Sequence, residues 1–299
     1  MRIKRLSLLS FCLAATGLIS FSCNAQILDT LEDGKMNPVE FRADAKVKAI
    51  IMTGTGMENR FQGRAGQGMA IHDKTMYRLY DTGLCQTFDL SDIANPQKKA
   101  SFQLGSYGSL NHANCAQIRL DDHGDILLYV SGIKGGKTYV ERMTETGSML
   151  VQTITLSEME LLSQTVTLNS ICGDDGCLWY FGSGSNQLLF AKARLPLLSE
   201  GDVSIGENDI LDFWSEEGFV YEEDVWQGGM VRNDLLFMLF GSTGAKAHLA
   251  VYDVRAHQRI MDIRLSGTIQ EEPEDCDIIP EGIIVVTNGG SHYYLIRPE

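Results

Sequence analysis

One local pattern repeats five times after residue 60, and it constrains the fold more than any other feature of the sequence. In each repeat a polar or acidic residue is followed by a residue that is usually small, then by an apolar run and a tight turn into a second apolar run. The five repeats open at Gln67, Asn114, Asn169, Gln227 and Glu274. Successive openings are 47 to 58 residues apart, about the length that four strands and their loops require. The chain is therefore expected to contain five similar four-stranded units.

The pattern between the openings predicts an all-β protein. Short β-branched and aromatic runs alternate with turn residues about every ten positions, and helical periodicity is nearly absent. The last repeat supplies only three strands before the chain ends, and residues 45–53 offer a fourth. We therefore predict a five-bladed β-propeller with four-stranded antiparallel blades, closed into a ring when the strand at 45–53 completes the last blade. A six-bladed ring with an irregular blade between 195 and 225, or a β-sandwich, are the alternatives.

The N-terminus is typical of a targeting segment. Basic residues precede an apolar run, Leu6–Phe21, which is short for a membrane span. Residues 1–25 are predicted to be a signal peptide cut after Ala25, and Cys23 offers the alternative of a lipid anchor. No later run is long and apolar enough to cross a bilayer. We expect an exported bacterial protein, either periplasmic, anchored at the outer membrane or secreted.

Charge and length limit the partners and the domain count. The formal net charge is −14, which disfavours nucleic acid because phosphate binding needs clustered basic residues. No linker divides the chain, so residues 26–44 are interpreted as an N-terminal extension and residues 45–299 as one propeller domain. We expect a monomer.

Two of the five cysteines that follow residue 25 are close in sequence. Cys172 and Cys177 flank Gly173–Gly176. A two-residue turn would place them opposite each other in a hairpin, at a spacing near the lower limit for a disulfide. The sequence thus suggests a Cys172–Cys177 disulfide, with two small buried thiols as the alternative.

The same stretch resembles the Asp-box of sialidases and related propellers. Asp174, Gly176 and Trp179 match the pattern Ser-x-Asp-x-Gly-x-x-Trp, and Cys172 stands in place of the Ser. In those families the box is a structural turn away from the active site. The overall organisation is similar to the five-bladed class that contains arabinanase-like and invertase-like glycosidases and tachylectin-like sugar binders, which implies an architecture and no single function.

Candidate ligand-binding residues gather where a propeller would place its central funnel. The set consists of amides, one imidazole, one indole and one carboxyl group: Gln67, His112, Asn114, Asn169, Trp226, Gln227 and Glu274. Amides both donate and accept hydrogen bonds, which suits sugar hydroxyls, and aromatic rings stack on the apolar face of a sugar. A glycan fragment or another small molecule in the funnel is the leading hypothesis. Alternatively, these amides cap strand ends or bind channel water.

Catalysis and metal binding are the other functions considered. Glycoside hydrolysis needs two carboxyl groups beside the scissile bond, and Glu274 with His112 could form an acid–base pair for hydrolysis or elimination of a polysaccharide. Glu223, Asp224 and Asp275 could supply oxygen ligands to Ca²⁺, and no other cofactor is expected. A protein-interaction platform is a third hypothesis.

Overall fold

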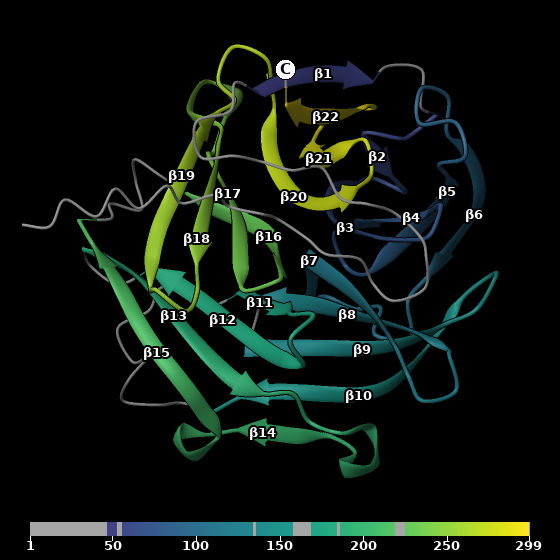
Figure 1. The fold of residues 1–299 in the computed structure, drawn as a ribbon. Coiled ribbons are helices and arrows are strands. Elements are labelled where there is room, and N and C mark those ends of the chain that lie inside the picture. The colour runs from purple at the N-terminus through teal and green to yellow at the C-terminus, as the bar shows by residue number, and fades with distance from the viewer. Residues whose placement is uncertain are drawn as a thin grey trace, which may run out of the picture.

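The computed structural model describes residues 47–52, 56–133, 136–157, 169–183, 186–218 and 225–298. The predicted signal peptide, Cys23, the extension 26–44 and the acidic pair Glu223 and Asp224 lie outside these ranges. Within them the chain forms five sheets arranged in a ring (Figure 1). The predicted five-bladed propeller is confirmed. No helix among the described residues has the length and hydropathy of a membrane span.

Each blade is a sheet of four or five strands, and its first-named strand below is the innermost. Blade 1 contains β3 (Arg64–His72), β4 (Thr75–Tyr80), β5 (Leu84–Asp89) and β6 (Gln97–Gln103), with the short β2 (Arg60–Phe61) beside β3. Blade 2 contains β7 (Asn111–Leu120), β8 (Ile126–Ile133), β9 (Lys137–Met143) and β10 (Ser148–Leu156). Blade 3 contains β11 (Asn169–Cys172), β12 (Cys177–Ser183), β13 (Gln187–Arg194) and β15 (Ile210–Glu217). Blade 4 contains β16 (Trp226–Arg232), β17 (Leu235–Phe240), β18 (His248–Asp253) and β19 (Gln258–Arg264).

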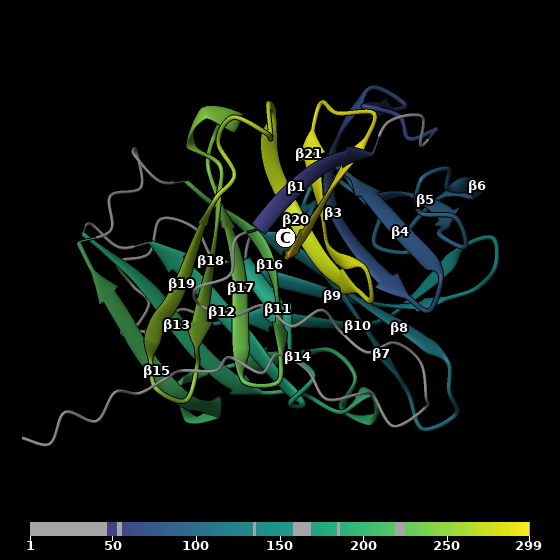
Figure 2. The same cartoon turned by 45° about the horizontal axis from the view of Figure 1, so that its top comes forward.

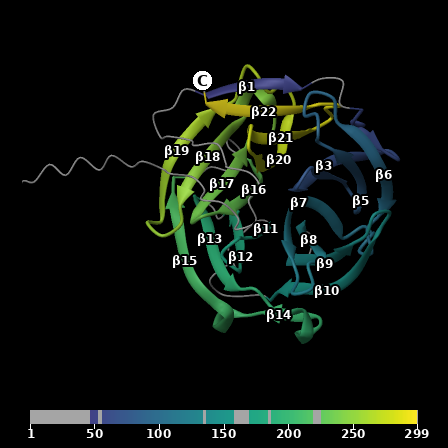
Figure 3. The same ribbon diagram turned by 45° about the vertical axis from the view of Figure 1, so that its right-hand side comes forward.

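Blade 5 joins the two ends of the described chain. It contains β20 (Glu272–Ile279), β21 (Gly282–Asn288), β22 (Tyr293–Pro298) and β1 (Val47–Met52). Strand β1 pairs antiparallel with β22, from Val47 opposite Pro298 to Met52 opposite Tyr293, and lies along it at the rim (Figures 2 and 3). The predicted closure is therefore confirmed, and it covers the edge of β22 that would otherwise be open to another chain.

The segment between 195 and 218 does not form a sixth blade. It contains two short 3₁₀ turns, Leu198–Glu200 and Glu207–Asp209, and strand β14 (Val203–Ile205). Strand β14 pairs parallel with β10 and so becomes a fifth, outermost strand of blade 2. Another 3₁₀ turn, Gly244–Lys246, lies between β17 and β18.

Strands in the middle of a blade are mostly buried because both faces of a blade are covered by its neighbours. All six residues of β17 are buried. Leu235, Phe237 and Leu239 pack toward blade 5, in a cluster with Ile283 and Val285. Leu236, Met238 and Phe240 pack toward blade 3, in a cluster that includes Trp179 and Phe190. Alternate side chains of one strand thus fill two different cores.

The suggested disulfide is not formed, and Cys172 and Cys177 are both free thiols. Cys172 lies opposite Leu178 in the β11–β12 ladder, one position away from the expected pairing. A one-residue offset moves a side chain to the other face of a sheet. Cys172 consequently packs in the core between blades 2 and 3, whereas Cys177 packs against the core between blades 3 and 4.

The turn that resembles an Asp-box forms hydrogen bonds within blade 3 and to blade 4. Asp175 accepts hydrogen bonds from the Cys177 backbone N–H (3.1 Å) and the Trp179 indole N–H (3.4 Å). Asp174 accepts one from the backbone N–H of Asn233 in blade 4, at 2.9 Å. The turn thereby fixes the hairpin of blade 3 against that of blade 4.

Candidate functional site

The inner strands β3, β7, β11, β16 and β20 surround the axis of the ring (Figure 3). The small residues that follow the openings let their backbones approach closely. A Cβ atom added to Gly68 would lie 2.7 Å from the Ala113 carbonyl oxygen, and one added to Gly228 would lie 2.5 Å from a carboxylate oxygen of Asp275. Both separations are too short for a larger residue, which explains why the repeat has a small residue at this position.

A bulge interrupts four of the five inner strands at this level. The ladder register shifts between Gly66 and Met69 in β3, between Asn111 and Cys115 in β7, between Trp226 and Gly229 in β16, and between Pro273 and Asp275 in β20. The residues inside these shifts include five of the predicted site residues: Gln67, His112, Asn114, Gln227 and Glu274. Bulges redirect side chains and are common beside active sites. The repeated sequence pattern therefore marks a repeated irregularity at the start of the inner strands.

The Asp275 carboxyl group forms hydrogen bonds with backbone groups of three blades. Its Oδ2 accepts hydrogen bonds from the backbone N–H groups of Met69 in blade 1 and Ala116 in blade 2, both at 3.0 Å. Its Oδ1 accepts one from the N–H of Cys276, at 2.9 Å. Burial raises the pKa of Asp275, and these donors oppose the rise because they stabilise the carboxylate. Its hydrogen-bonding capacity is used inside the protein, and among the described residues no group of three His, Cys, Asp or Glu side chains has a metal-binding arrangement.

Arg78 is a buried cation beside the carboxyl groups of blade 5, and the sequence reasoning did not find it. Its guanidinium donates to the carbonyl oxygens of Gln67, Gly68 (3.2 Å) and Thr287 (2.8 Å). These bonds hold the bulge of β3 against β21. All residues of β4 after Thr75 are buried, and only the ring geometry shows which groups Arg78 meets.

Glu274 lies close enough to Arg78 for the guanidinium charge to act against a rise in its pKa, yet the pKa of Glu274 is well above the usual value of 4.5. Burial is the largest cause, and the nearby charge of Glu272 acts in the same direction. Arg78 and a hydrogen bond from Asn288 oppose the rise only in part. The site therefore favours a protonated carboxylic acid at Glu274, which can donate a hydrogen bond or act as a general acid.

Several amides at this end of the ring already have partners. Gln227 Nε2 donates to Glu272 Oε1 (2.9 Å) and to the Gly241 carbonyl oxygen (3.2 Å). Asn169 Nδ2 donates to the Gln227 carbonyl oxygen at 3.5 Å. Asn288 Nδ2 donates to Glu272 Oε2 at 3.3 Å. The described partners of these three amides are therefore groups of the protein itself.

Three other buried polar atoms at the same level have no partner among the described residues. They are Gln67 Oε1, Asn114 Nδ2 and Thr287 Oγ1. Their residues are 4 %, 4 % and 1 % exposed. Burying a polar atom without a hydrogen bond costs about 1–3 kcal/mol, so each such atom needs an explanation. Thr287 has no signal in the sequence, because it lies at the end of an ordinary apolar strand.

The described contacts of Trp226 and His112 lie within the protein. Trp226 is only 3 % exposed and packs edge-on against Phe181, with ring centroids 5.2 Å apart, so it does not present an open ring to a ligand. His112 Nδ1 lies 3.0 Å from Asp81 Oδ1. The described partner of His112 is therefore Asp81 in blade 1, whereas the charged neighbour of Glu274 is Arg78.

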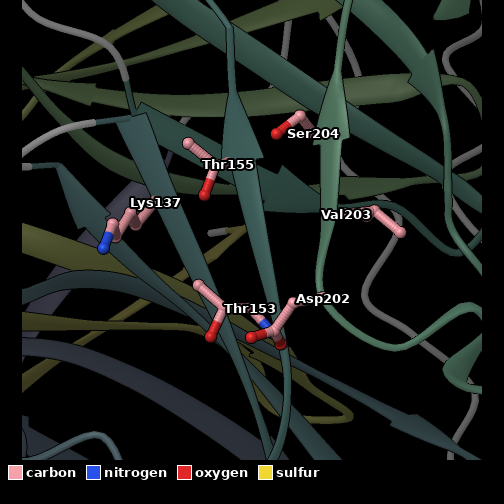
Figure 4. Close-up of a pocket in the computed structure, with 6 residues that line it drawn as sticks. All are labelled: Lys137, Thr153, Thr155, Asp202, Val203 and Ser204. Atoms are coloured by element: carbon pink, nitrogen blue, oxygen red, sulfur yellow. The ribbon is translucent and has the colours of Figure 1, made fainter.

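A concave feature lies away from the axis, on the outer part of blade 2 (Figure 4). It is a polar hollow of about 270 Å³ beside the β10–β14 pair. Its lining residues are Lys137, Thr153, Thr155, Asp202, Val203 and Ser204. Asp202 also accepts a hydrogen bond from the Thr153 backbone N–H at 2.6 Å, so part of this lining serves to hold the added strand.

Comparisons with known proteins confirm the fold and go no further. No protein-family model and no curated protein matches the sequence. A solved tail fibre of Staphylococcus aureus phage P68 is 12 % identical with a TM-score of 0.52 and covers 84 % of this chain. This chain spans about half of the tail fibre's length, 52 %. At this identity the likeness shows a shared propeller fold alone.

Two carbohydrate-active propellers are also similar in shape. An exo-β-1,3-galactanase from Phanerochaete chrysosporium, solved with galactose, is 10 % identical with a TM-score of 0.48, and the match covers 84 % of this chain and 64 % of that one. A GH43 β-1,3-galactosidase is 11 % identical with a TM-score of 0.48, covering 83 % and 60 % of the two chains. Their similarity is too low to carry an argument about function, which must come from the site itself.

Proposed function

We propose that this protein is an exported β-propeller that binds a small polyhydroxylated ligand, a glycan fragment, where the inner strands begin. The observation that carries the proposal is the bulge shared by β3, β7, β16 and β20 at one level of the axis. A propeller with only a structural role could have regular hydrogen-bond ladders in every blade. Four bulges at one level are instead consistent with side chains redirected toward a common ligand.

The chemistry of the unpartnered atoms matches sugar hydroxyl groups. Gln67 Oε1 can only accept a hydrogen bond, Asn114 Nδ2 can only donate, and Thr287 Oγ1 can do both. A hydroxyl group both donates and accepts, so one class of ligand can satisfy all three. Protonated Glu274 would add a donor. Since each atom costs free energy while it is unsatisfied, a ligand that pairs with it gains affinity and selectivity.

Binding is tested by isothermal titration calorimetry with maltotriose, cellotriose, xylotriose and β-1,3-galactotriose. We expect at least one trisaccharide to bind, and Gln67→Ala or Asn114→Ala to weaken that binding about tenfold, the effect of losing about 1.4 kcal/mol. The matched control is Gln103→Ala, which removes an exposed amide from the outermost strand of the same blade. Absence of binding to every probe, or equal affinities in all variants, would refute the proposal.

A second candidate function is cleavage of a polysaccharide by hydrolysis or elimination, and the raised pKa of Glu274 favours it. A carboxyl group whose pKa is raised keeps its proton to a higher pH and can then protonate a leaving group. Prolonged incubation with plant and animal polysaccharides, followed by chromatography of the products, tests this function. Product formation that continues unchanged in Glu274→Gln would reject Glu274 as the acid.

A further inference from the structure

Two neighbouring blades are joined at the start of β7 by a paired set of loops, which we call the blade 1–2 rim. It comprises residues 81–83, between β4 and β5, and residues 105–113, which end with the first three residues of β7. The Gly108 N–H donates to the Thr82 carbonyl oxygen at 3.0 Å, and His112 contacts Asp81. The rim lies beside the bulge of β7 that contains Asn114.

We infer that Asp81 is a positioning residue that fixes the tautomer of His112 for contact with a ligand. An ionised carboxylate has no hydrogen to donate, so the 3.0 Å contact places the hydrogen on His112 Nδ1. Nε2 then carries a lone pair and accepts hydrogen bonds. The side chains of His112 and Asp81 are 29 % and 27 % exposed, so the pair is partly open to solvent and not sealed in the core.

The backbone on both sides of this pair is held in an unfavourable conformation. Thr82 has φ of 70° and Ala113 has φ of 54°. A left-handed conformation is rare for residues other than Gly, Asn and Asp, and it is a clear outlier for a β-branched residue such as Thr82. Strain of this kind gathers at functional sites. Here one strained residue follows Asp81 and the other follows His112.

Side chains that face the rim hold it in place. Glu141, fully buried in β9, accepts hydrogen bonds from the backbone N–H groups of Gly105 (3.0 Å) and Ser106 (2.8 Å). Asn111 Oδ1 accepts one from the Ala113 N–H at 3.0 Å, and Asn111 Nδ2 donates to Ser106 Oγ at 2.7 Å. A loop fixed by this many bonds presents His112 in one orientation, which is what a preorganised binding residue requires.

The rim also carries exposed apolar surface. Tyr107 is 42 % exposed and Leu110 is 49 % exposed. An imidazole nitrogen that accepts from a hydroxyl group, on the same rim as an exposed aromatic side chain, matches a sugar, which has hydroxyl groups at its edge and an apolar face of C–H groups. This inference rests on the proposed function and refines it: the rim recognises a neutral sugar hydroxyl through His112 Nε2, with Tyr107 against the sugar face.

The tautomer is measured without any ligand by long-range ¹H–¹⁵N spectra of ¹⁵N-histidine-labelled protein, at a pH of about 8.5 where histidine side chains are ordinarily neutral. We expect wild-type His112 to show protonated Nδ1 and unprotonated Nε2, and Asp81→Ala to lose that preference. The matched control is Asp212→Ala, which removes the carboxylate 2.7 Å from His257 Nε2 and leaves the rim untouched. A wild-type His112 protonated at Nε2 overturns the inference.

The ligand contact is measured with whichever trisaccharide binds in calorimetry. Saturation should shift the His112 Nε2 signal, and both Asp81→Ala and His112→Phe should weaken binding about tenfold, whereas Asp212→Ala should bind as wild type does. Binding without a shift at His112, or with affinity unchanged in both rim variants, overturns the contact. If no trisaccharide binds, the proposed function and the ligand contact both fall, while the tautomer measurement still decides the role of Asp81.

Discussion

The axial carboxylate offers the sharpest test of how this propeller is held together. Asp275 accepts three backbone hydrogen bonds, from Met69, Ala116 and Cys276, and lies 3.5 Å from the Cys115 thiol. Leaving a buried donor without an acceptor costs about 1–3 kcal/mol. In Asp275→Asn the amide nitrogen replaces one oxygen and cannot accept. If the nitrogen takes the Oδ1 position, the bonds from the Cys276 N–H and the Cys115 thiol are lost, and the two backbone bonds that cross to other blades remain.

We therefore expect Asp275→Asn to lower the free energy of unfolding by about 1–3 kcal/mol. Asp275→Ala should cost more, because all three N–H groups lose their acceptor. Part of that loss is offset by removal of the carboxylate's desolvation cost, which leaves a net decrease of about 3–5 kcal/mol. For a domain of this size each kcal/mol lowers Tm by about 2–4 °C.

Equilibrium urea unfolding followed by tryptophan fluorescence measures both values. Asp122→Asn, an exposed carboxyl-to-amide change in blade 2, is the matched control and should be neutral within about 0.5 kcal/mol. An Asp275→Asn variant as stable as the control would refute the view that the acceptor oxygens of Asp275 hold the axis together. So would an Asp275→Ala variant more stable than Asp275→Asn.

Two further predictions follow from burial. Because the pKa of Glu274 is raised above its usual value of 4.5, its contribution to the stability of the folded protein is full below about pH 4.5 and is lost as the pH rises through the folded-state pKa. Glu274→Gln should therefore unfold at a higher urea concentration than wild type at pH 8 and at the same concentration at pH 4, whereas the exposed control Glu281→Gln should match wild type at both pH values. A wild-type protein more stable than Glu274→Gln at pH 8 would contradict this prediction. In thiol titration of a chain that begins at Gln26, all five thiols should react after denaturation without reductant. In the native state only Cys177, which is half-buried, should react, and it should react slowly. A total of three reactive thiols after denaturation would instead indicate the Cys172–Cys177 disulfide.

Much of the architecture was readable in the sequence because a propeller repeats one local arrangement. The five openings mark the starts of the inner strands, and the small residues after them are required where backbones meet at the axis. The assignment of residues 45–53 to the last blade followed from counting strands, since an unpaired edge is unfavourable. The Cys172–Cys177 pairing failed because a difference of one residue in a hairpin, which alters no sequence pattern, reverses the face of a side chain.

Only part of the candidate site could be predicted from the sequence. Gln67, Asn114, Gln227 and Glu274 could be selected because they recur at equivalent positions of a repeat. Arg78 and Thr287 could not, because each lies within an ordinary strand and outside the repeated positions.

What the sequence determined by itself is the set of features that depend on neighbouring residues: strand spacing, the recurrent polar openings and the closing strand. Only the tertiary structure decided which groups meet across blades, such as Arg78 with blade 5, Asp275 with three blades, and His112 with Asp81. Those contacts join residues from opposite ends of the chain or from adjacent loops of different sheets. Their partners are set by how the sheets pack around the axis, and no periodicity within one strand records that packing.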